Sequence, residues 1–192
     1  LQDRVDRGRF EQAEALGDAM LAALATNDVA ARAEQLAGID PQSAEAGAVL
    51  RLLTAAEQVE AGETAAAAQT LESLAVDGDV PEIYRQLASF KAMTLPDTDM
   101  AVEDRRQALE AMAQPGNPLR LLAGEQLALL DIAQDQPEAA IARYQAILQD
   151  AETTSDLQQR ALQVIVALGG EPELDENAIA AGDAVTGQAV GN

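Results

Sequence analysis

The stretch that decides the fold is residues 119–148, LRLLAGEQLALLDIAQDQPEAAIARYQAIL. Apolar residues recur at helical spacing on either side of a short polar segment at 134–138. This pattern predicts one helix, a tight turn and a second helix that packs back on the first. Much of the remaining chain consists of imperfect copies of this hairpin, so function is expected to depend on a helical surface.

The composition favours helices and removes the side chains that most active sites need. Alanine and leucine dominate while β-branched residues are sparse, which predicts an all-α fold. The chain has no cysteine and no histidine, so thiolate chemistry, cysteine-ligated zinc and the usual general base are excluded. The acidic segment 97–104 lacks the glycine of a calcium loop. We therefore expect no catalytic residues, no metal, no cofactor and no enzymatic activity.

The charge is strongly negative and evenly distributed. The formal net charge of the 192 residues is −21, with 33 acidic and 12 basic residues, and Lys91 is the single lysine. Such a surface repels nucleic acid and anionic lipid, so neither is an expected direct partner. We interpret the charge as a general coat that keeps the protein soluble; steering of a basic partner is the alternative.

Caps and helix breakers divide the chain into nine expected helices. Asn27–Asp28 and Ser43 are expected N-caps and Gly62 is an expected helix end. Asp79 with Glu82 and Asp135 with Glu138 match the D-x-x-E capping box. The pair Asn117–Pro118 is expected to start a helix. The expected ranges are 9–25, 28–38, 43–61, 64–75, 80–94, 100–113, two helices within 119–148, and 153–168.

Two of these helices carry apolar stripes that are expected to face the core. The stripe of helix 9–25 consists of Phe10, Ala13, Gly17, Met20 and Leu24. The stripe of helix 43–61 consists of Val49, Leu52, Leu53, Ala56 and Val59.

A repeat near 36 residues links the second helices of successive hairpins. Large residues recur with spacings of 35, 38 and 35 at Leu36, Leu71, Leu109 and Tyr144, and three residues later at Ile39, Leu74, Met112 and Ile147. This period predicts a right-handed helical-hairpin solenoid of about four helix pairs, with 153–168 as a C-terminal capping helix. An alanine-rich bundle with accidental registration is the alternative. The expected organisation is a lead-in or linker at 1–8, a repeat domain at 9–170 and a flexible acidic tail at 171–192.

The hairpins resemble the tetratricopeptide repeat. The segment 135–141 with Tyr144 resembles the turn, small-residue pair and aromatic of that repeat, and 62–68 with Leu71 is a weaker copy. The bulky aromatic of the first helix is missing, and Asn27 and Met100 stand where a turn glycine is common, so the units are degenerate.

A closer resemblance covers residues 9–170. It is to the bacterial tetratricopeptide-like family of the ancillary Sec translocon subunit, and it is carried by the segments 15–19, 81–88, 120–128 and 164–170. Leu1 is not an initiator methionine, and the resemblance implies an inner-membrane anchor before it. It also implies a location on the periplasmic side of the bacterial inner membrane and contacts with the translocon or periplasmic chaperones.

The repeat register predicts which residues form a binding groove. Leu52 and Ala56 in one unit and Glu125 and Leu129 in another would point into the concave face built by first helices, as would suit capture of a helix or an extended peptide. For Leu52 and Leu129 a place in the core is the alternative. The leading functional hypothesis is a non-catalytic protein-binding module. The alternative is a self-associating scaffold that uses end helices such as 9–25 and forms a homo-oligomer.

Overall fold

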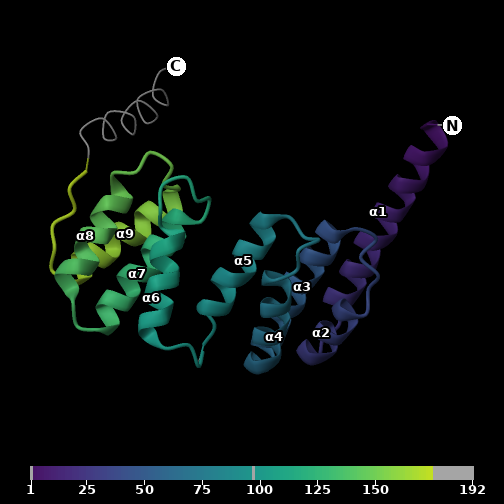
Figure 1. Cartoon of the computed structure of the whole chain (residues 1–192), viewed down its shortest axis with the longest axis horizontal. Helices are drawn as coiled ribbons and strands as arrows, with labels where there is room; N and C mark the ends of the chain where they lie inside the picture. Colours follow the sequence, from purple (N-terminus) through teal and green to yellow (C-terminus); the bar gives the residue numbers. More distant parts are fainter. Residues whose placement is uncertain (1, 97, 175–192) are drawn as a thin grey trace, which may run out of the picture. The chain divides into compact units, whose positions relative to one another are not determined.

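The structure is a computed structural model that describes residues 2–96 and 98–174, and the regular structure of these residues is entirely helical (Figure 1). The chain divides into two compact units, Leu1–Met100 and Ala101–Asn192. The first unit holds α1 (Gln2–Leu24), α2 (Val29–Ala37), α3 (Ala44–Glu60), α4 (Thr64–Ala75) and α5 (Glu82–Met93). The second unit holds α6 (Val102–Met112), α7 (Arg120–Ala133), α8 (Pro137–Leu148) and α9 (Ser155–Ala167).

Within each unit the helices pack in chain order. In the first unit α1 packs on α2, α2 on α3, α3 on α4 and α4 on α5, and α3 also meets α5. In the second unit α6 packs on α7, α7 on α8 and α8 on α9. The all-α prediction is confirmed, and sequential packing of this kind is consistent with an array of helical hairpins.

Equivalent positions of the two units differ by 73 in residue number, as between Val29 and Val102, and we call this spacing the unit offset. The helices α2 and α6 begin at Val29 and Val102, α4 and α8 begin at Thr64 and Pro137, and α5 and α9 begin at Glu82 and Ser155. Buried side chains follow the same offset in the pairs Leu36/Leu109, Leu71/Tyr144 and Leu74/Ile147. The unit offset is close to twice the predicted repeat of about 36 residues. The paired residues above therefore occupy equivalent points of their helices in the two units.

The cores are built from alanine and a few large side chains. In the first unit one cluster contains Ala48, Ala55, Ala67, Leu71, Leu74, Val80 and Ala88, and a smaller one contains Ala23, Leu36 and Leu50. In the second unit the cluster contains Ala128, Ala140, Tyr144, Ile147, Leu157, Ala161 and Ile165. Alanine lets helix backbones approach closely, and the large residues fill the spaces that remain. The prediction that Leu36, Leu71, Leu109 and Tyr144 are packing residues is confirmed, since each is at most 1% exposed.

Several predicted helix ends are confirmed by their backbone geometry. Ser43 caps α3, since its side chain accepts a hydrogen bond from Ala46 N at 3.1 Å. Asp28 caps α2 in the same way through Ala30 N. Gly62 follows α3 with a φ of +79°, a conformation that costs glycine little.

Both predicted capping boxes are wrong. The helix after Asp79 begins only at Glu82, and the Asp79 backbone N–H donates to Asp77 Oδ1, so Asp79 belongs to a turn. Asp135 has a φ of +59° and the helix after it begins at Pro137 with no side-chain cap. The unit offset carries Gly62 onto Asp135, so Asp135 fills the same left-handed position of the turn between paired helices. The capping signature fails because aspartate also suits turns of this kind.

The predicted start of α7 is also wrong. Pro118 precedes the helix, which begins at Arg120. Asn117 still binds a free backbone donor, because its Oδ1 accepts from Leu119 N at 2.8 Å. The extra turn before the helix accounts for the later start.

The inward stripe predicted for the first helix is wrong at Phe10. That side chain is 79% exposed, and the buried side of α1 consists of Ala23 with Leu16 and Met20 partly covered. The helix also begins at Gln2, well before the expected start at Arg9. With 9 residues, α2 is roughly 14 Å long, and α1 is roughly 35 Å long. The partner helix is therefore too short to cover the N-terminal half of α1.

The stripe predicted for α3 is wrong in part. Its fully buried residues are Gly47, Ala48, Leu50, Thr54 and Ala55. Leu52 and Val59 are half-buried and Ala56 is exposed. Because α3 packs against α2, α4 and α5, its buried face is wider than one stripe and rotated from the predicted one.

The end of the chain is described up to Leu174. Within the segment predicted as an acidic tail, the Glu173 backbone N–H donates to Gln145 Oε1 at 3.0 Å, which joins this point to α8. The remainder of that segment, 175–192, lies outside the described residues. In the described part of the chain, no helix has the length and apolar character needed to cross a membrane.

Candidate functional site

A cleft of about 290 Å³ opens in the first unit between α3, α4 and the end of α5. Two of the predicted groove residues, Leu52 and Ala56, line it together. The described residues that line it are Leu52, Ala55, Ala56, Val59, Leu71, Lys91, Thr94, Leu95 and Pro96. Three helices and the segment after α5 thus build one shared apolar surface.

The floor of the cleft is the outer surface of the core. Ala55 and Leu71 are buried members of the main cluster of the first unit, and Leu52, Val59 and Leu95 pack partly against that cluster. The turn at Gly62 brings α4 back along α3, which places Leu71 opposite Ala55 in this layer. A side chain that entered the cleft would therefore contact residues that the core already holds in place.

Lys91 is the one charged residue among the described residues that line the cleft. It lies in the last turn of α5, is exposed, and is the only lysine of the chain. It forms no ion pair with a carboxylate of residues 2–96 or 98–174. Sequence reasoning did not select Lys91, although its being the only lysine was a usable signal. The residues 94–96 were missed because nothing in their pattern places them against α3.

The other two predicted residues lie at the equivalent place in the second unit. The unit offset carries Leu52 onto Glu125 and Ala56 onto Leu129, both on α7. Leu129 is 43% exposed. Glu125 makes a two-pronged ion pair with Arg160 of α9, with Nε–Oε1 and Nη2–Oε2 distances of 2.9 Å. The Glu125 carboxylate therefore joins α7 to α9.

Larger side chains occupy the second unit at three of the positions that line the cleft. Ala56, Val59 and Leu71 of the first unit correspond to Leu129, Ile132 and Tyr144 of the second. Tyr144 is only 1% exposed and belongs to the core of its unit. The cleft of the first unit thus lies where the second unit carries extra side-chain volume, including a buried aromatic ring.

The surroundings of Tyr144 keep its hydroxyl protonated. Burial raises the pKa of Tyr144 to about 12, the negative charge of Glu125 contributes to this rise, and the positive charge of Arg160 opposes it. At neutral pH the side chain is therefore uncharged, as suits a core residue.

One buried carboxylate joins three helices of the second unit. Asp131 of α7 is 1% exposed, and its Oδ1 lies 2.8 Å from Arg106 Nη1 of α6. Its Oδ2 lies 2.7 Å from Arg143 Nε of α8. Both oxygens are thus engaged, so Asp131 has a packing role. The sequence signal was an aspartate within the apolar run LALLDIA, which the periodicity argument passed over.

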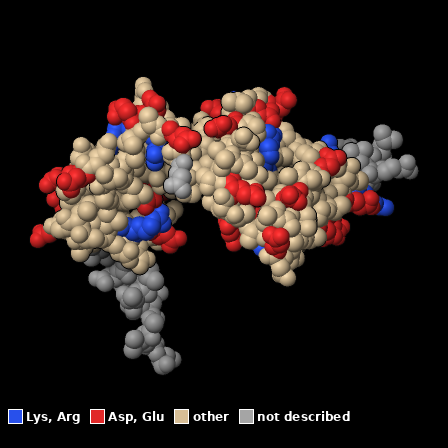
Figure 2. All heavy atoms as spheres, turned by 90° about the horizontal axis from the view of Figure 1, so that it is seen from below, with Lys and Arg blue, Asp and Glu red and all other residues tan. Residues whose placement is uncertain are grey.

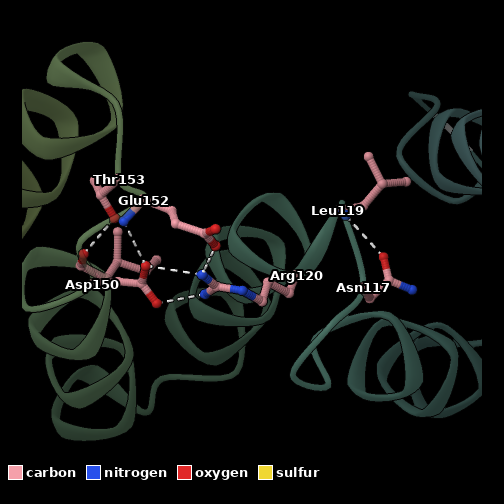
Figure 3. Close-up of polar contacts among 7 residues, drawn as sticks. Asn117, Leu119, Arg120, Asp150, Glu152 and Thr153 are labelled. Carbon is pink, nitrogen blue, oxygen red and sulfur yellow. Dashed lines mark hydrogen bonds and ion pairs between the residues drawn. The ribbon is translucent and has the colours of Figure 1, made fainter.

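Arginine also fixes the turns that follow α4 and α8. Arg120 Nη1 lies 2.5 Å from Asp150 Oδ2, and Arg120 also bonds Glu152 (Figure 3). Asp150 Oδ1 in turn accepts from the Glu152 backbone N–H at 2.9 Å. The hydrogen bond from Arg120 holds the pKa of the Asp150 carboxyl below its ordinary value. These carboxylates are committed to holding the turn.

The equivalent turn of the first unit is built in the same way. The unit offset carries Asp77 onto Asp150, and Arg51 Nη2 lies 2.7 Å from Asp77 Oδ2. This bond lowers the pKa of Asp77. A second depression of about 540 Å³ lies beside this pair and is lined mainly by polar residues, including Asp40, Gln42 and Asp79. Arg51 and Asp77 neutralise each other, whereas Asp40 and Asp79 form no ion pair with a described cation, so the described lining of this depression is net negative.

Metal binding finds no support in the described part of the chain. No group of three or more Asp, Glu, His or Cys side chains in residues 2–96 and 98–174 could hold a metal ion. Asp97, which begins the acidic segment 97–104, lies outside those residues.

Comparison with known proteins gives no family for this chain. No family model matches it, and no curated protein and no solved structure matches it. The resemblance to the translocon-associated family stays a prediction, and the residues of the chain itself carry the functional argument.

Proposed function

We propose that the protein is a non-catalytic protein-binding module that presents the cleft of α3, α4 and α5 to a partner polypeptide. The observation that carries this proposal is the cleft itself, an apolar concavity lined from three helices. Concave apolar surfaces with a few polar groups at the edge are the usual form of binding sites. Helical arrays bind peptides on such surfaces through apolar anchor residues.

We further propose that the helices form a right-handed solenoid of the tetratricopeptide type. The unit offset supports it, because the starts of α2 and α6, of α4 and α8, and of α5 and α9 repeat with that spacing, as do several buried residues and the left-handed residues Gly62 and Asp135. Packing of each helix on its chain neighbours within each unit also supports it. In such an array the first helix of each hairpin, α3 in the first unit and α7 in the second, lines the inner face of its own unit.

The partner and location proposed here rest on the resemblance of residues 9–170. They are the Sec translocon or periplasmic chaperones, at the periplasmic side of the bacterial inner membrane. A partner protein would contact the cleft with an apolar side chain.

Affinity capture from detergent-solubilised bacterial membranes tests this proposal. The bait is the wild-type chain, and the matched control is an Ala56→Leu, Val59→Ile variant that carries the residues of the second unit in the cleft. We expect translocon or chaperone components with the wild type and at least fivefold less with the variant. Recovery of no such component would contradict the proposed partner, and equal recovery by both baits would contradict the role of the cleft.

A self-associating scaffold is a second candidate, favoured by the exposed apolar face of α1. Phe10 is 79% exposed and Leu21 is 69% exposed, and they lie three helical turns apart on one side of that helix. Light scattering across micromolar concentrations tests this candidate. Growth of the particle mass that a Phe10→Gln, Leu21→Gln variant abolishes would support it, whereas a strictly monomeric wild-type protein would exclude it.

A further inference from the structure

We propose that the cleft of the first unit binds one aromatic side chain of a partner polypeptide, with a carboxylate of the partner held by Lys91 at the rim. This inference rests on the proposed function and names the chemistry that the cleft selects. The ligand is thus an aromatic residue with an acidic group beside it, such as a neighbouring acidic residue or a chain terminus.

The size of the ligand side chain follows from comparison of the two units. At the position of Leu71 the second unit has Tyr144, whose buried ring belongs to the core of that unit. At two more positions of the lining, Ala56 and Val59, the second unit has leucine and isoleucine. The same helix arrangement therefore accommodates an aromatic ring and several methyl groups that the first unit lacks.

The space available is sufficient for an aromatic ring. The cleft measures about 290 Å³. An apolar cavity of about 150 Å³ is enough to bind benzene in other proteins. One ring with the first atoms of its backbone thus fits, and the opening toward solvent leaves a path for the rest of the partner chain.

The chemistry of the wall selects an apolar group. Leu52, Val59, Leu71 and Leu95 supply the large side chains of the lining, and none of the described residues that line the cleft is acidic. The equivalent of Leu52 in the second unit is Glu125, so the corresponding wall there carries a charge that is neutralised by Arg160. At the position of Leu52 the first unit lacks that charge, and leucine and valine side chains offer an apolar wall to a ring.

The charge of the rim selects the group beside the ring. Lys91 is the only cation among the described residues that line the cleft, on a chain with a net charge of −21. Acidic side chains are spread over the face of the molecule seen in Figure 2, and the net charge of −21 repels an acidic partner. The nearby positive charge of Lys91 attracts a single carboxylate, while salt screens the repulsion from more distant acidic side chains. The attraction to Lys91 therefore outweighs that repulsion.

The test uses N-acetyl-L-phenylalanine in its carboxylate form as the probe and two-dimensional amide and methyl NMR of the whole chain as the readout. We expect shifts confined to residues of the cleft, such as Leu52 and Val59, with a dissociation constant of about 1 mM for a ligand of this size. The amide of the same amino acid, which lacks the charge, should bind two- to fivefold more weakly, on the order expected for an exposed ion pair. Lys91→Gln should abolish that difference.

Matched variants locate the binding site. Ala56→Leu with Val59→Ile should weaken binding at least about tenfold, because it fills the space for the ring. Leu129→Ala, at the equivalent position of the second unit, should leave binding unchanged. Circular dichroism of each variant checks that it is folded, and Lys91→Gln, an exposed change, supplies a second test if the filled variant does not fold.

Three outcomes would overturn the inference: no shift with either probe, shifts outside the cleft, or equal affinity for the acid and the amide. If the probe fails while affinity capture still depends on the filled cleft, the inference falls and the proposed function stands. If the probe binds as expected while capture recovers no partner, the named partner falls and the chemistry of the cleft stands.

Discussion

At the scale of single residues, buried polar groups distinguish the second unit. Asp131 is the one carboxylate buried among the residues that the structure describes, and Arg106 and Arg143 each contact one of its oxygens. A buried charge is tolerated only when its partners replace the lost water, and removal of one partner leaves the others uncompensated. An apolar side chain at the position of Asp131 would need no such counter-charges.

Asp131→Asn should therefore destabilise the protein strongly. The change leaves two partly buried guanidinium groups without their counter-charge, so we expect a loss of about 3 kcal/mol in the free energy of unfolding. Urea unfolding followed by circular dichroism measures this loss. The control is Glu60→Gln, which alters the exposed pair of Glu60 with Arg32 and should cost less than about 1 kcal/mol. Equal losses for the two variants would show that the Asp131 contacts add no stability.

Tyr144 should ionise at a higher pH than an exposed tyrosine. Its pKa of about 12 arises first from burial and then from the charge of Glu125, against an ordinary value of about 10. Between these values the unfolded chain loses the Tyr144 proton while the folded chain keeps it, so stability should fall as pH rises through this window. In a Tyr84→Phe variant Tyr144 is the only tyrosine. Its absorbance near 295 nm should then titrate with a midpoint near 12, and near 10 in concentrated urea. A folded-state midpoint near 10 would contradict the burial of the ring.

At the scale of helices and turns, the same left-handed position is occupied by different residues. Gly62 and Asp135 each follow the first helix of a hairpin, with φ values of +79° and +59°. The hydrogen bonds of the two turns also correspond, since Glu63 N bonds Gln58 O and Gln136 N bonds Asp131 O. Glycine adopts this conformation freely, whereas aspartate adopts it at a reduced cost because its short side chain bonds locally.

Substitution by alanine at the two turns should therefore have unequal effects. Gly62→Ala should lower stability by about 1 kcal/mol, because alanine strains at positive φ. Asp135→Ala should lower it by less, since the native residue already bears part of that strain. Urea midpoints of the two variants give the comparison. A larger loss at Asp135 would mean that its carboxylate contributes more to the turn than its backbone conformation costs.

Local signals predicted elements better than they predicted contacts. Ser43, Asp28 and Gly62 could be identified because a cap or a helix end is decided by neighbouring residues. The capping boxes at Asp79 and Asp135 failed because the same residues serve turns equally well.

The candidate site was predicted in part, for a related reason. The repeat register placed Leu52 and Ala56 in one cleft, as the structure does. Lys91 and residues 94–96 reach that cleft from a different helix and loop, through packing of α5 on α4 and α3. No local pattern encodes such packing. The engagement of Glu125 by Arg160, which lies two helices further along the chain, was missed for the same reason.

At the scale of the whole molecule, negative charge and a small set of arginines oppose each other. Acidic side chains are distributed across the visible face instead of forming one patch (Figure 2). Arginines connect elements within each unit through ion pairs, at Arg32, Arg51, Arg106, Arg120, Arg143 and Arg160. With 33 acidic and 12 basic residues, most acids have no cation to pair with, so the folded chain repels itself.

Added salt should therefore stabilise the protein. Screening reduces the repulsion among exposed acids over distances of about 10 Å at 0.1 M, while the partly buried arginine pairs are screened less. We expect the urea midpoint to rise between about 10 and 300 mM sodium chloride, because the repulsion that is screened exceeds the attraction that is lost. Sodium sulfate at matched ionic strength separates screening from salt exclusion, which adds a further rise. A midpoint that falls with sodium chloride would show that the ion pairs outweigh the general repulsion.

Lys91 allows the cleft to be labelled selectively. Because Lys91 is the single lysine of the 192 residues, reagents that acylate lysine side chains can modify only that side chain among them. A bifunctional amine cross-linker would thus join the Lys91 side chain to a partner at the mouth of the cleft, and digestion followed by mass spectrometry would identify the linked residues. Because lysine is so scarce in this chain, a cross-link at Lys91 identifies a partner that lies close to α3 and α5.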